Sequence, residues 1–347
     1  MTTKPERPAR RVSQQDIARE ANVSRVTVSL VLAGKDQTSE ETRKRVLEAA
    51  KRLRYRPNLL VQGMQTGRTG AIGVIMPVSM WFHGQIAKGL HDELIEADFV
   101  PVQLWTSPRT HTKELELDQI HRLVDRRVDG MIIFPVDASV PDVHFQEIWQ
   151  REIPLVTVDR ETTTHADHVG TDEELGGRLA GEHLLSLGHK RALLVTFPGK
   201  VGNTYRRGQS FIKAIEQGGG KVETIAGHPE DIDAPLKQAL SRAEGSRPTA
   251  VFAAMDPLAL KVYGMAVELG ISVPRQLSVV GYADFPFAVD MAPPLTTVKQ
   301  DPYQMGRQAA RVLLDRILDR AQSAAPHRYH FAPELIIRRS TAKAPQG

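Results

Sequence analysis

The sequence predicts a small all-α head joined to a larger α/β body of two doubly wound, parallel-sheet lobes. Three observations lead to this fold class: short capped helical patterns in a basic N-terminal segment, strand–helix alternation from residue 70 onward, and a length of 347 residues. At about 100–200 residues per domain, such a chain has room for two or three domains. We expect a helical head over 1–57, a hinge and linker over 58–69 and a body over 70–347.

Composition narrows the class of protein. The chain has no cysteine, which excludes disulfides and thiolate metal sites. No apolar run approaches the roughly 18 residues of a membrane span, and the basic N-terminus lacks the apolar core of a secretory signal, so we expect a cytoplasmic location. The first 70 residues hold 15 Lys and Arg against 7 Asp and Glu. Such a basic segment is typical of a nucleic-acid-binding module, although a solvated surface gives the same pattern.

Three short helices are predicted in the head. Ser13 and Asp16 indicate a capped start for the first helix, Ser24 caps a second, and Thr38 with Glu41 forms a capping box for a third. The tight turn between the first two helices is typical of a helix-turn-helix, whose second helix enters the DNA major groove. Any small three-helix bundle would show a similar pattern.

The head also resembles the LacI/GalR family of transcription regulators. The resemblance rests on consecutive blocks at 16–24, 27–29, 31–35, 39–43 and 55–58. It implies that the following residues contact DNA: Ser24, Arg25, Val26, Thr27, Ser29, Leu30, Lys35, Tyr55, Asn58 and Met64.

The chemistry of these residues indicates what each could read. Arg25 can donate two hydrogen bonds to guanine, whereas Val26 offers only apolar contact, for instance to a thymine methyl group. Leu30 stands where the family often has Arg, so it either changes the base preference or merely extends the helix core. By resemblance, the hinge folds on the operator and Met64 is a candidate minor-groove wedge.

In the body, short apolar runs alternate with amphipathic stretches. Strands are predicted at 71–76, 99–105, 130–134, 155–158, 192–196, 249–253 and 277–281, and helices at 86–97, 116–126, 175–187, 209–217, 257–269 and 303–319. This alternation favours parallel sheets covered by helices on both faces. Ligands of such folds bind at the carboxyl ends of the strands.

The sequence contains no nucleophile elbow, zinc-protease motif, Walker loop or dinucleotide fingerprint. Gly199 and Gly202 are better explained by a turn than by a phosphate loop. His165 and His168 have the spacing of a metal-ligand pair, but a polar loop with solvated histidines is the simpler interpretation. We therefore predict no enzyme, no catalytic residue, no cofactor and no metal site.

The body resembles the same family, which has a periplasmic-binding-protein-like fold. This implies an N-lobe of about 70–164 and 296–325, and a C-lobe of about 165–295 and 326–341, with an effector bound between them. The implied effector-binding residues are Phe82, Asp159, Arg207, Asp256 and Asp284.

These residue types suit a polyhydroxylated ligand, because Arg donates hydrogen bonds and carboxylates accept them from hydroxyl groups. Each polar position also has a structural alternative: Arg207 could pair with a carboxylate, Asp256 could cap a helix, and Asp159 and Asp284 could be turn residues. A sugar is favoured, while a nucleobase, a sugar phosphate or action without an effector stays open.

The sequence as a whole predicts a DNA-binding transcriptional regulator, in its simplest form a repressor. It would bind a near-palindromic operator as a homodimer and respond to a sugar-like effector. The seven residues after Ser340 contain no leucine heptad, so we expect a dimer rather than a coiled-coil tetramer. The alternative is a sugar-binding receptor or an enzyme whose basic head mediates protein contacts.

Overall fold

The structure is a computed structural model. It describes residues 12–32, 38–56, 68–77, 81–106, 112–137, 142–162, 165–318 and 325–345. The chain divides into two compact units, Met1–Thr69 and Gly70–Gly347. Three residues predicted to contact DNA, Lys35, Asn58 and Met64, lie outside the described residues, as does most of the linking segment over 58–69.

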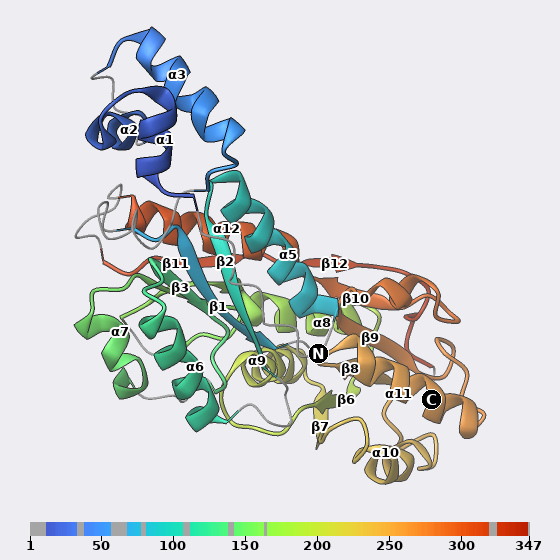
Figure 1. The fold of residues 1–347 in the computed structure, drawn as a ribbon. Coiled ribbons are helices and arrows are strands. Elements are labelled where there is room, and N and C mark those ends of the chain that lie inside the picture. The colour runs from blue at the N-terminus through green and yellow to red at the C-terminus, as the bar shows by residue number, and fades with distance from the viewer. Residues whose placement is uncertain are drawn as a thin grey trace, which may run out of the picture. The chain divides into compact units, whose positions relative to one another are not determined.

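The head consists of α1 (Gln14–Ala21), α2 (Arg25–Leu32) and α3 (Glu40–Arg52) (Figure 1). All three helices bury one apolar face in a common core, which contains Ile17, Ala18, Ala21, Val28, Val31, Val46 and Ala49. The three predicted helices therefore pack around one core, and the short turn between α1 and α2 agrees with the predicted helix-turn-helix arrangement.

Local capping explains where the helices of the head begin. The Asp16 carboxylate accepts hydrogen bonds from the backbone N–H and the hydroxyl of Ser13, at 2.9 and 2.7 Å. The Ser24 hydroxyl oxygen accepts the N–H of Thr27 at 3.0 Å, which caps α2. The predicted capping box of the third helix is wrong by one residue, because Ser39, not Thr38, accepts the N–H of Thr42.

The first lobe of the body contains a six-stranded parallel sheet in the order β11-β5-β4-β3-β1-β2. Its strands are β1 (Ala71–Pro77), β2 (Val100–Thr106), β3 (Gly130–Ile133), β4 (Leu155–Val158), β5 (Asp167–Thr171) and β11 (Arg328–Phe331). Its helices are α5 (Trp81–Glu96), α6 (Lys113–Asp125), α7 (Gln146–Gln150) and α12 (Pro302–Ile317), with a 3₁₀ turn, η1 (Asp142–Phe145). Alternate residues of β1 face opposite sides of the sheet: Val74 packs in the core with α5 and α12, and Ile75 packs with α6 and α7.

The second lobe repeats this plan with a sheet in the order β12-β10-β9-β8-β6-β7. Its strands are β6 (Arg191–Thr196), β7 (Lys221–Ala226), β8 (Ala250–Ala253), β9 (Ser278–Ala283), β10 (Thr296–Lys299) and β12 (Glu334–Ile336). Its helices are α8 (Glu173–Ser186), α9 (Asn203–Gln217), α10 (Asp233–Leu240) and α11 (Asp256–Glu268), with η2 (Pro286–Val289). The pairing is parallel except between β10 and β12, which are antiparallel. The predicted fold class is thus confirmed.

The expected lobe boundaries need correction. β5 and β11 belong to the first sheet, whereas 165–171 and 326–331 were expected in the C-lobe; β10 belongs to the second sheet, whereas 296–299 was expected in the N-lobe. In each case the chain completes its strand in one sheet and crosses to the other lobe only afterwards, near residues 172, 300 and 332. The crossovers therefore follow the carboxyl ends of strands.

None of the helices within the described ranges is long and apolar enough to cross a membrane.

Candidate functional site

The N-terminal end of α2 holds the exposed candidate contact residues of the head. Ser24, Arg25 and Val26 are exposed, and Val26 leaves 69% of its surface accessible. Thr27, Ser29 and Leu30 are half-buried. Because Val28 and Val31 already fill the core-facing side of this short helix, Val26 has no packing role and is free to contact another molecule.

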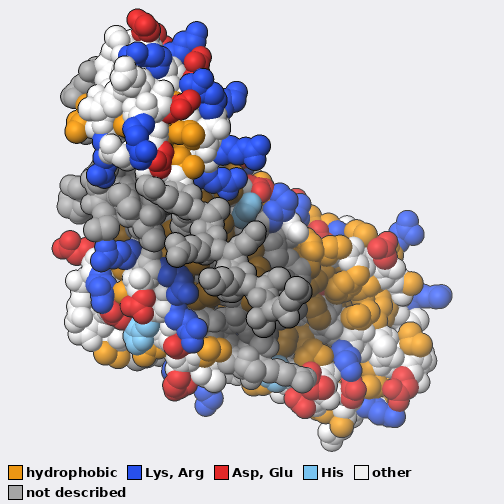
Figure 2. Space-filling model, in the orientation of Figure 1, with side chains coloured by type: hydrophobic (Ala, Val, Ile, Leu, Met, Phe, Trp, Pro, Cys, Tyr) orange, Lys and Arg blue, Asp and Glu red, His pale blue; other side chains and the backbone are white. Residues whose placement is uncertain are grey.

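The head surface carries many basic side chains, five of them on α3. Figure 2 shows Lys and Arg side chains spread over the head.

Tyr55, also predicted to contact DNA, is half-buried and packs against the core of the head. Leu30 is not among the described residues that build this core, so the core-extension alternative gains no support.

In the body, Arg207 is bound by Glu173. The Glu173 carboxylate accepts hydrogen bonds from the guanidinium at 2.7 and 2.8 Å and from the Tyr282 hydroxyl at 2.8 Å. The Tyr282 ring lies under the guanidinium, 3.3 Å from ring centroid to Cζ, and the Ala254 carbonyl accepts a further hydrogen bond. Burial raises the pKa of Tyr282 far above its usual value, with the Glu173 charge as a second cause, so the hydroxyl stays protonated.

The packing of two helices brings Glu173 and Arg207 together. Glu173 is the first residue of α8, and Arg207 lies in the second turn of α9. A Cβ atom at Gly177 would collide with the carbonyl oxygen of Arg207, so glycine lets the two helix backbones touch. Of the alternatives that the sequence left open for Arg207, the structure thus contains the carboxylate pair.

Asp159 follows β4 in the first lobe and faces the same cluster. Burial raises the pKa of its carboxyl to about 7, and the Glu173 charge contributes to the increase. Its backbone is left-handed, with φ of 62°, and its carbonyl accepts a hydrogen bond at 2.9 Å from the side chain of Asn203 in the second lobe. The end of β4 is therefore tied to the start of α9 across the lobe boundary.

Asp256 and Asp284 organise the end of β9. The buried Asp256 carboxylate accepts hydrogen bonds from the N–H of Phe285 and the hydroxyl of Thr297, both at 2.7 Å. It does not cap α11, for which Met255 is the N-cap residue. Asp284 has a left-handed φ of 54° and pairs with Arg338 at 2.7 Å. Both carboxylates thus have structural partners, as the alternative interpretation of Asp284 as a turn residue anticipated.

Phe82 is buried in the core of the first lobe, whereas the preceding residue, Trp81, is exposed. Trp81 opens α5 and lies 5.5 Å, between ring centroids, from Phe285 at the end of β9. This pair was not predicted from the sequence, and neither were Glu173 and Asn203. Their common signal was their position directly after a strand or at a helix start.

Two acceptor atoms in this region are buried without a described hydrogen-bond partner. They are Oε1 of Glu173 and Oδ1 of Asn203. Buried polar atoms are nearly always paired in folded proteins, and a bound molecule is one way in which such pairing is completed. The arrangement can therefore accept hydrogen bonds from a ligand placed between the lobes.

The interpretation of His168 as a solvated loop residue is wrong. His168 lies in β5 with 1% of its surface exposed, and burial lowers the pKa of its imidazole to about 3. His165 is exposed, as expected, and its ring lies 5.3 Å from that of Trp149. The error arose because Asp167 and Thr171 make this buried strand look polar.

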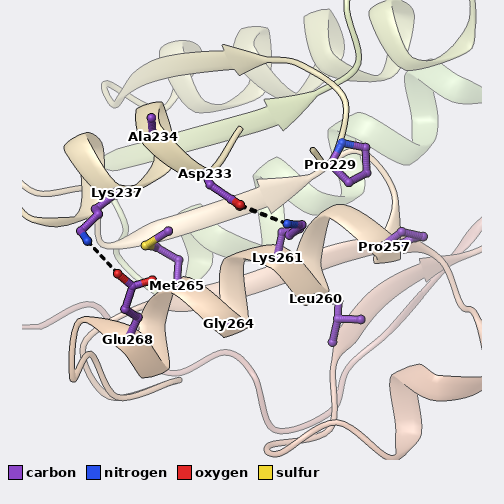
Figure 3. Close-up of a pocket in the computed structure, with 10 residues that line it drawn as sticks. All are labelled: Pro229, Asp233, Ala234, Lys237, Pro257, Leu260, Lys261, Gly264, Met265 and Glu268. Carbon is purple, nitrogen blue, oxygen red and sulfur yellow. Dashed lines mark hydrogen bonds and ion pairs between the residues drawn. The ribbon is translucent and has the colours of Figure 1, made fainter. Parts of the chain in front are cut away.

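A pocket of about 630 Å³ lies between α10 and α11, and none of the predicted effector residues lines it. Figure 3 shows two ion pairs that join these helices, Lys237 with Glu268 at 2.7 Å and Lys261 with Asp233 at 3.2 Å. Its lining residues are Pro229, Asp233, Ala234, Lys237, Pro257, Leu260, Lys261, Gly264, Met265 and Glu268.

Comparisons with known proteins agree with both parts of the chain. Residues 13–58 match the model for bacterial regulatory proteins of the lacI family, and residues 182–341 match a periplasmic binding protein-like domain. The HTH-type transcriptional regulator MalR of Streptomyces coelicolor is 34% identical over 344 residues, covering 95% of this chain and 96% of MalR.

Two solved structures extend the similarity to the fold. The lac repressor dimer bound to operator and the anti-inducer ONPF has a TM-score of 0.81 and 25% identity, covering 96% of this chain and all of that chain. The complex of the transcriptional regulator CelR with cellobiose has a TM-score of 0.68 and 28% identity, covering 95% of this chain and all of CelR.

A helix-turn-helix head joined to a two-lobed body of this fold defines a DNA-binding transcriptional regulator. The chain belongs to the LacI family of bacterial regulatory proteins.

Proposed function

We propose that this protein is a repressor that binds a near-palindromic operator as a homodimer, in the bacterial cytoplasm where the DNA lies, and that a sugar-like effector between the two lobes switches it. The head over 1–57 would contact DNA, the segment over 58–69 would act as the hinge, and the body from residue 70 would bind the effector and the second subunit. We propose no catalytic activity.

The observation that carries the DNA-binding proposal is the exposed start of α2. Arg25 and Val26 project from a helix whose other face is fixed in the core, so a donor and an apolar group are presented side by side. This pair suits a guanine next to a thymine methyl group in the major groove. The similarity to the lac repressor, whose dimer was solved on an operator, supports the same mode for this chain.

A binding selection on genomic DNA tests this part of the proposal. The selection should yield a near-palindromic site. Fluorescence anisotropy on that site should show an affinity that falls steeply as the salt concentration rises, because phosphate contacts release counterions. If binding stays non-specific at physiological salt, the proposal fails and the receptor or enzyme alternative gains. A gel shift with the upstream region of the protein's own gene is a simple first assay.

The charges at the lobe boundary favour a neutral, hydroxyl-rich effector over an anionic one. Arg207 is already neutralised by Glu173, and the free acceptors are the carboxylate oxygen of Glu173 and the amide oxygen of Asn203. Such acceptors match hydroxyl donors, whereas a phosphate or carboxylate would bring further acceptors and negative charge. The cellobiose in the CelR complex is a ligand of this chemistry.

Thermal shift measurements test the effector class. Cellobiose, ribose and glucose should be compared with glucose 6-phosphate and adenine, and only neutral sugars should stabilise the protein. Asn203→Ala should weaken the response to the best sugar, since it removes an acceptor and a cross-lobe hydrogen bond. Lys200→Ala, an exposed change in the preceding loop, is the matched control. Stabilisation by the anionic sugar alone would contradict the proposed class.

The proposed homodimer would use apolar surface on the body. Leu260 and Val267 lie seven residues apart on one face of α11, and 52% and 81% of their surfaces are exposed. Figure 2 shows apolar side chains gathered over part of the body. Exposed apolar residues grouped on one helix face are typical of a surface that another protein covers.

A further inference from the structure

A second cluster of ligating side chains lies at the edge of the first lobe. Glu161 follows β4, His168 lies in β5 and His330 lies in β11, and one ligating atom of each lies within 4.8 Å of the others. Glu161 and His168 are seven residues apart, and His330, which is distant in sequence, joins them because β11 pairs with β5. The proposed function makes no use of them.

The register of the strands brings His168 and His330 to one face of the sheet, next to Gly170. His330 is the partner of Gly170, and His168 and Gly170 are two residues apart on β5, so all three face the same side of the sheet. A Cβ atom at Gly170 would lie 2.6 Å from Nε2 of His168 and 3.2 Å from the Asp159 carbonyl oxygen. Any side chain at position 170 would therefore displace the imidazole, and glycine allows Nε2 of His168 to lie against this strand.

Thr157 lies next to Nδ1 of His168. Its hydroxyl oxygen is 3.2 Å from the Asp167 carbonyl oxygen and 3.0 Å from Nδ1 of His168. When the hydroxyl donates to the carbonyl, Nδ1 carries the hydrogen and donates it to Thr157. Nε2 then presents a lone pair, and this buried atom has no hydrogen-bond partner among the described residues. A second hydrogen bond that orients the ring in this way is typical of metal-binding histidines.

We propose that Glu161, His168 and His330 form a three-ligand site for a late first-row transition-metal dication such as Zn²⁺. Two imidazoles and one carboxylate suit Zn²⁺, Co²⁺ or Ni²⁺, whereas Mg²⁺ and Ca²⁺ prefer sets made only of oxygen. Tetrahedral bonds of about 2.0–2.1 Å place ligand atoms about 3.4 Å apart. The side chains of the exposed His330 and the half-buried Glu161 would close the remaining gap.

Two arginines compete with a cation for Glu161. Arg206, from α9 of the second lobe, pairs with its carboxylate at 3.1 Å, and Arg328 does so at 3.0 Å. A metal ion bound by Glu161 would displace these partners, including the one that ties the two lobes together. Metal binding is thus expected to weaken a cross-lobe ion pair, and removal of Arg206 is expected to strengthen metal binding.

Isothermal titration of the full, untagged chain with Zn²⁺ tests the site. Wild type should bind one Zn²⁺ per chain, and Mg²⁺ should not compete for this site. When Co²⁺ replaces Zn²⁺, the complex should show the visible absorption of a low-symmetry site with nitrogen ligands. His330→Ala and Glu161→Gln should each lower the Zn²⁺ affinity at least about tenfold. His327→Ala, an exposed histidine just before β11, is the matched control and should leave the affinity unchanged.

Two further variants keep the test independent of ligand loss. Gly170→Ala keeps all three ligand residues but places a Cβ atom 2.6 Å from Nε2 of His168, so the imidazole must shift. This change should also lower the affinity, whereas Arg206→Gln should raise it. The proposal is overturned if wild type binds no Zn²⁺, if His327→Ala loses as much as His330→Ala, or if Arg206→Gln binds no more tightly than wild type.

Discussion

The carboxylate of Glu173 holds the guanidinium of Arg207 at 2.7 Å, and only 2% and 3% of these residues are exposed. The positive charge that the sequence suggested for effector binding is therefore already neutralised inside the second lobe. What the pair leaves at the lobe boundary is a free carboxylate oxygen and the nearby Asp159. Of the two hydrogen-bonding roles expected from the sequence, donation by arginine is already used by Glu173, and acceptance by carboxylates is what is left for a ligand.

Removing one member of this pair should be costly. We expect Glu173→Gln to lower the free energy of unfolding of the body by about 3–5 kcal/mol, because it leaves the buried guanidinium without its counter-charge. Urea unfolding can be followed by tryptophan fluorescence, since Trp81, Trp105 and Trp149 all lie in the body. Glu174→Gln, the exposed neighbour, should change stability by less than about 0.5 kcal/mol. Equal effects of the two changes would refute this account.

Asp256 should make stability depend on pH. Burial raises the pKa of its carboxyl to about 7, and the Asp284 charge adds to the increase, whereas an unfolded aspartate titrates near about 3.9. Between these values the folded chain holds a proton that the unfolded chain has released. The contribution of Asp256 to stability is thus greatest below about pH 4 and is lost as the pH rises through about 7.

The measurement compares wild type with Asp256→Asn by denaturant unfolding at several pH values. The unfolding free energy of wild type minus that of the variant should fall by at most about 1.4 kcal/mol per pH unit between about pH 4 and pH 7, and should level off above about pH 8. Asp290→Asn, at an exposed aspartate nearby, should give a flat difference. A difference that rises with pH would show that the carboxyl is stabilised in its charged form.

The strands that the sequence predicted are buried on both faces, except the edge strand β2. β3, β4 and β8 consist of four buried residues each, and their apolar runs are unmistakable. β5 is equally buried but contains Asp167, His168 and Thr171, each of which forms a hydrogen bond to another element. β7 is a half-exposed edge strand. These strands were missed because long-range partners, not local composition, make them strands, and the lobe boundaries were misplaced with them.

The candidate site, like the strands, could be predicted from the sequence only where contacts between separate elements are not involved. Resemblance identified Arg207 and Asp159, but it could not identify Glu173 as the partner of Arg207, which lies 34 residues away in sequence. That choice depends on the close approach of α8 and α9 at Gly177, a contact between separate elements. Spacing along one helix predicts neighbours on that helix and gives no information about the facing one.

Arg25 should determine base preference. We expect Arg25→Ala to lose about 1–3 kcal/mol on the specific operator and to relax base choice at one position per half-site, since a bidentate donor is lost. Competition anisotropy on operator variants and on random DNA measures both effects. Lys44→Ala, an exposed change on α3, should affect specific and random DNA alike. If Arg25→Ala also weakens both equally, Arg25 contacts only the DNA backbone.

The face of α11 should control assembly. Wild type is expected to sediment as a dimer at micromolar concentration, and a tetramer would contradict the proposed assembly. Leu260→Glu combined with Val267→Glu should give a monomer, because unpaired charges would be buried wherever this face is covered. Val201→Glu places the same charge on an apolar residue that is 56% exposed but lies in the loop before α9, and should leave the dimer intact.

The monomeric variant should still bind a half-site weakly, and its preference for the complete near-palindrome should disappear, since two heads no longer bind together. If the double variant remains a dimer, the subunits meet through another surface of the body.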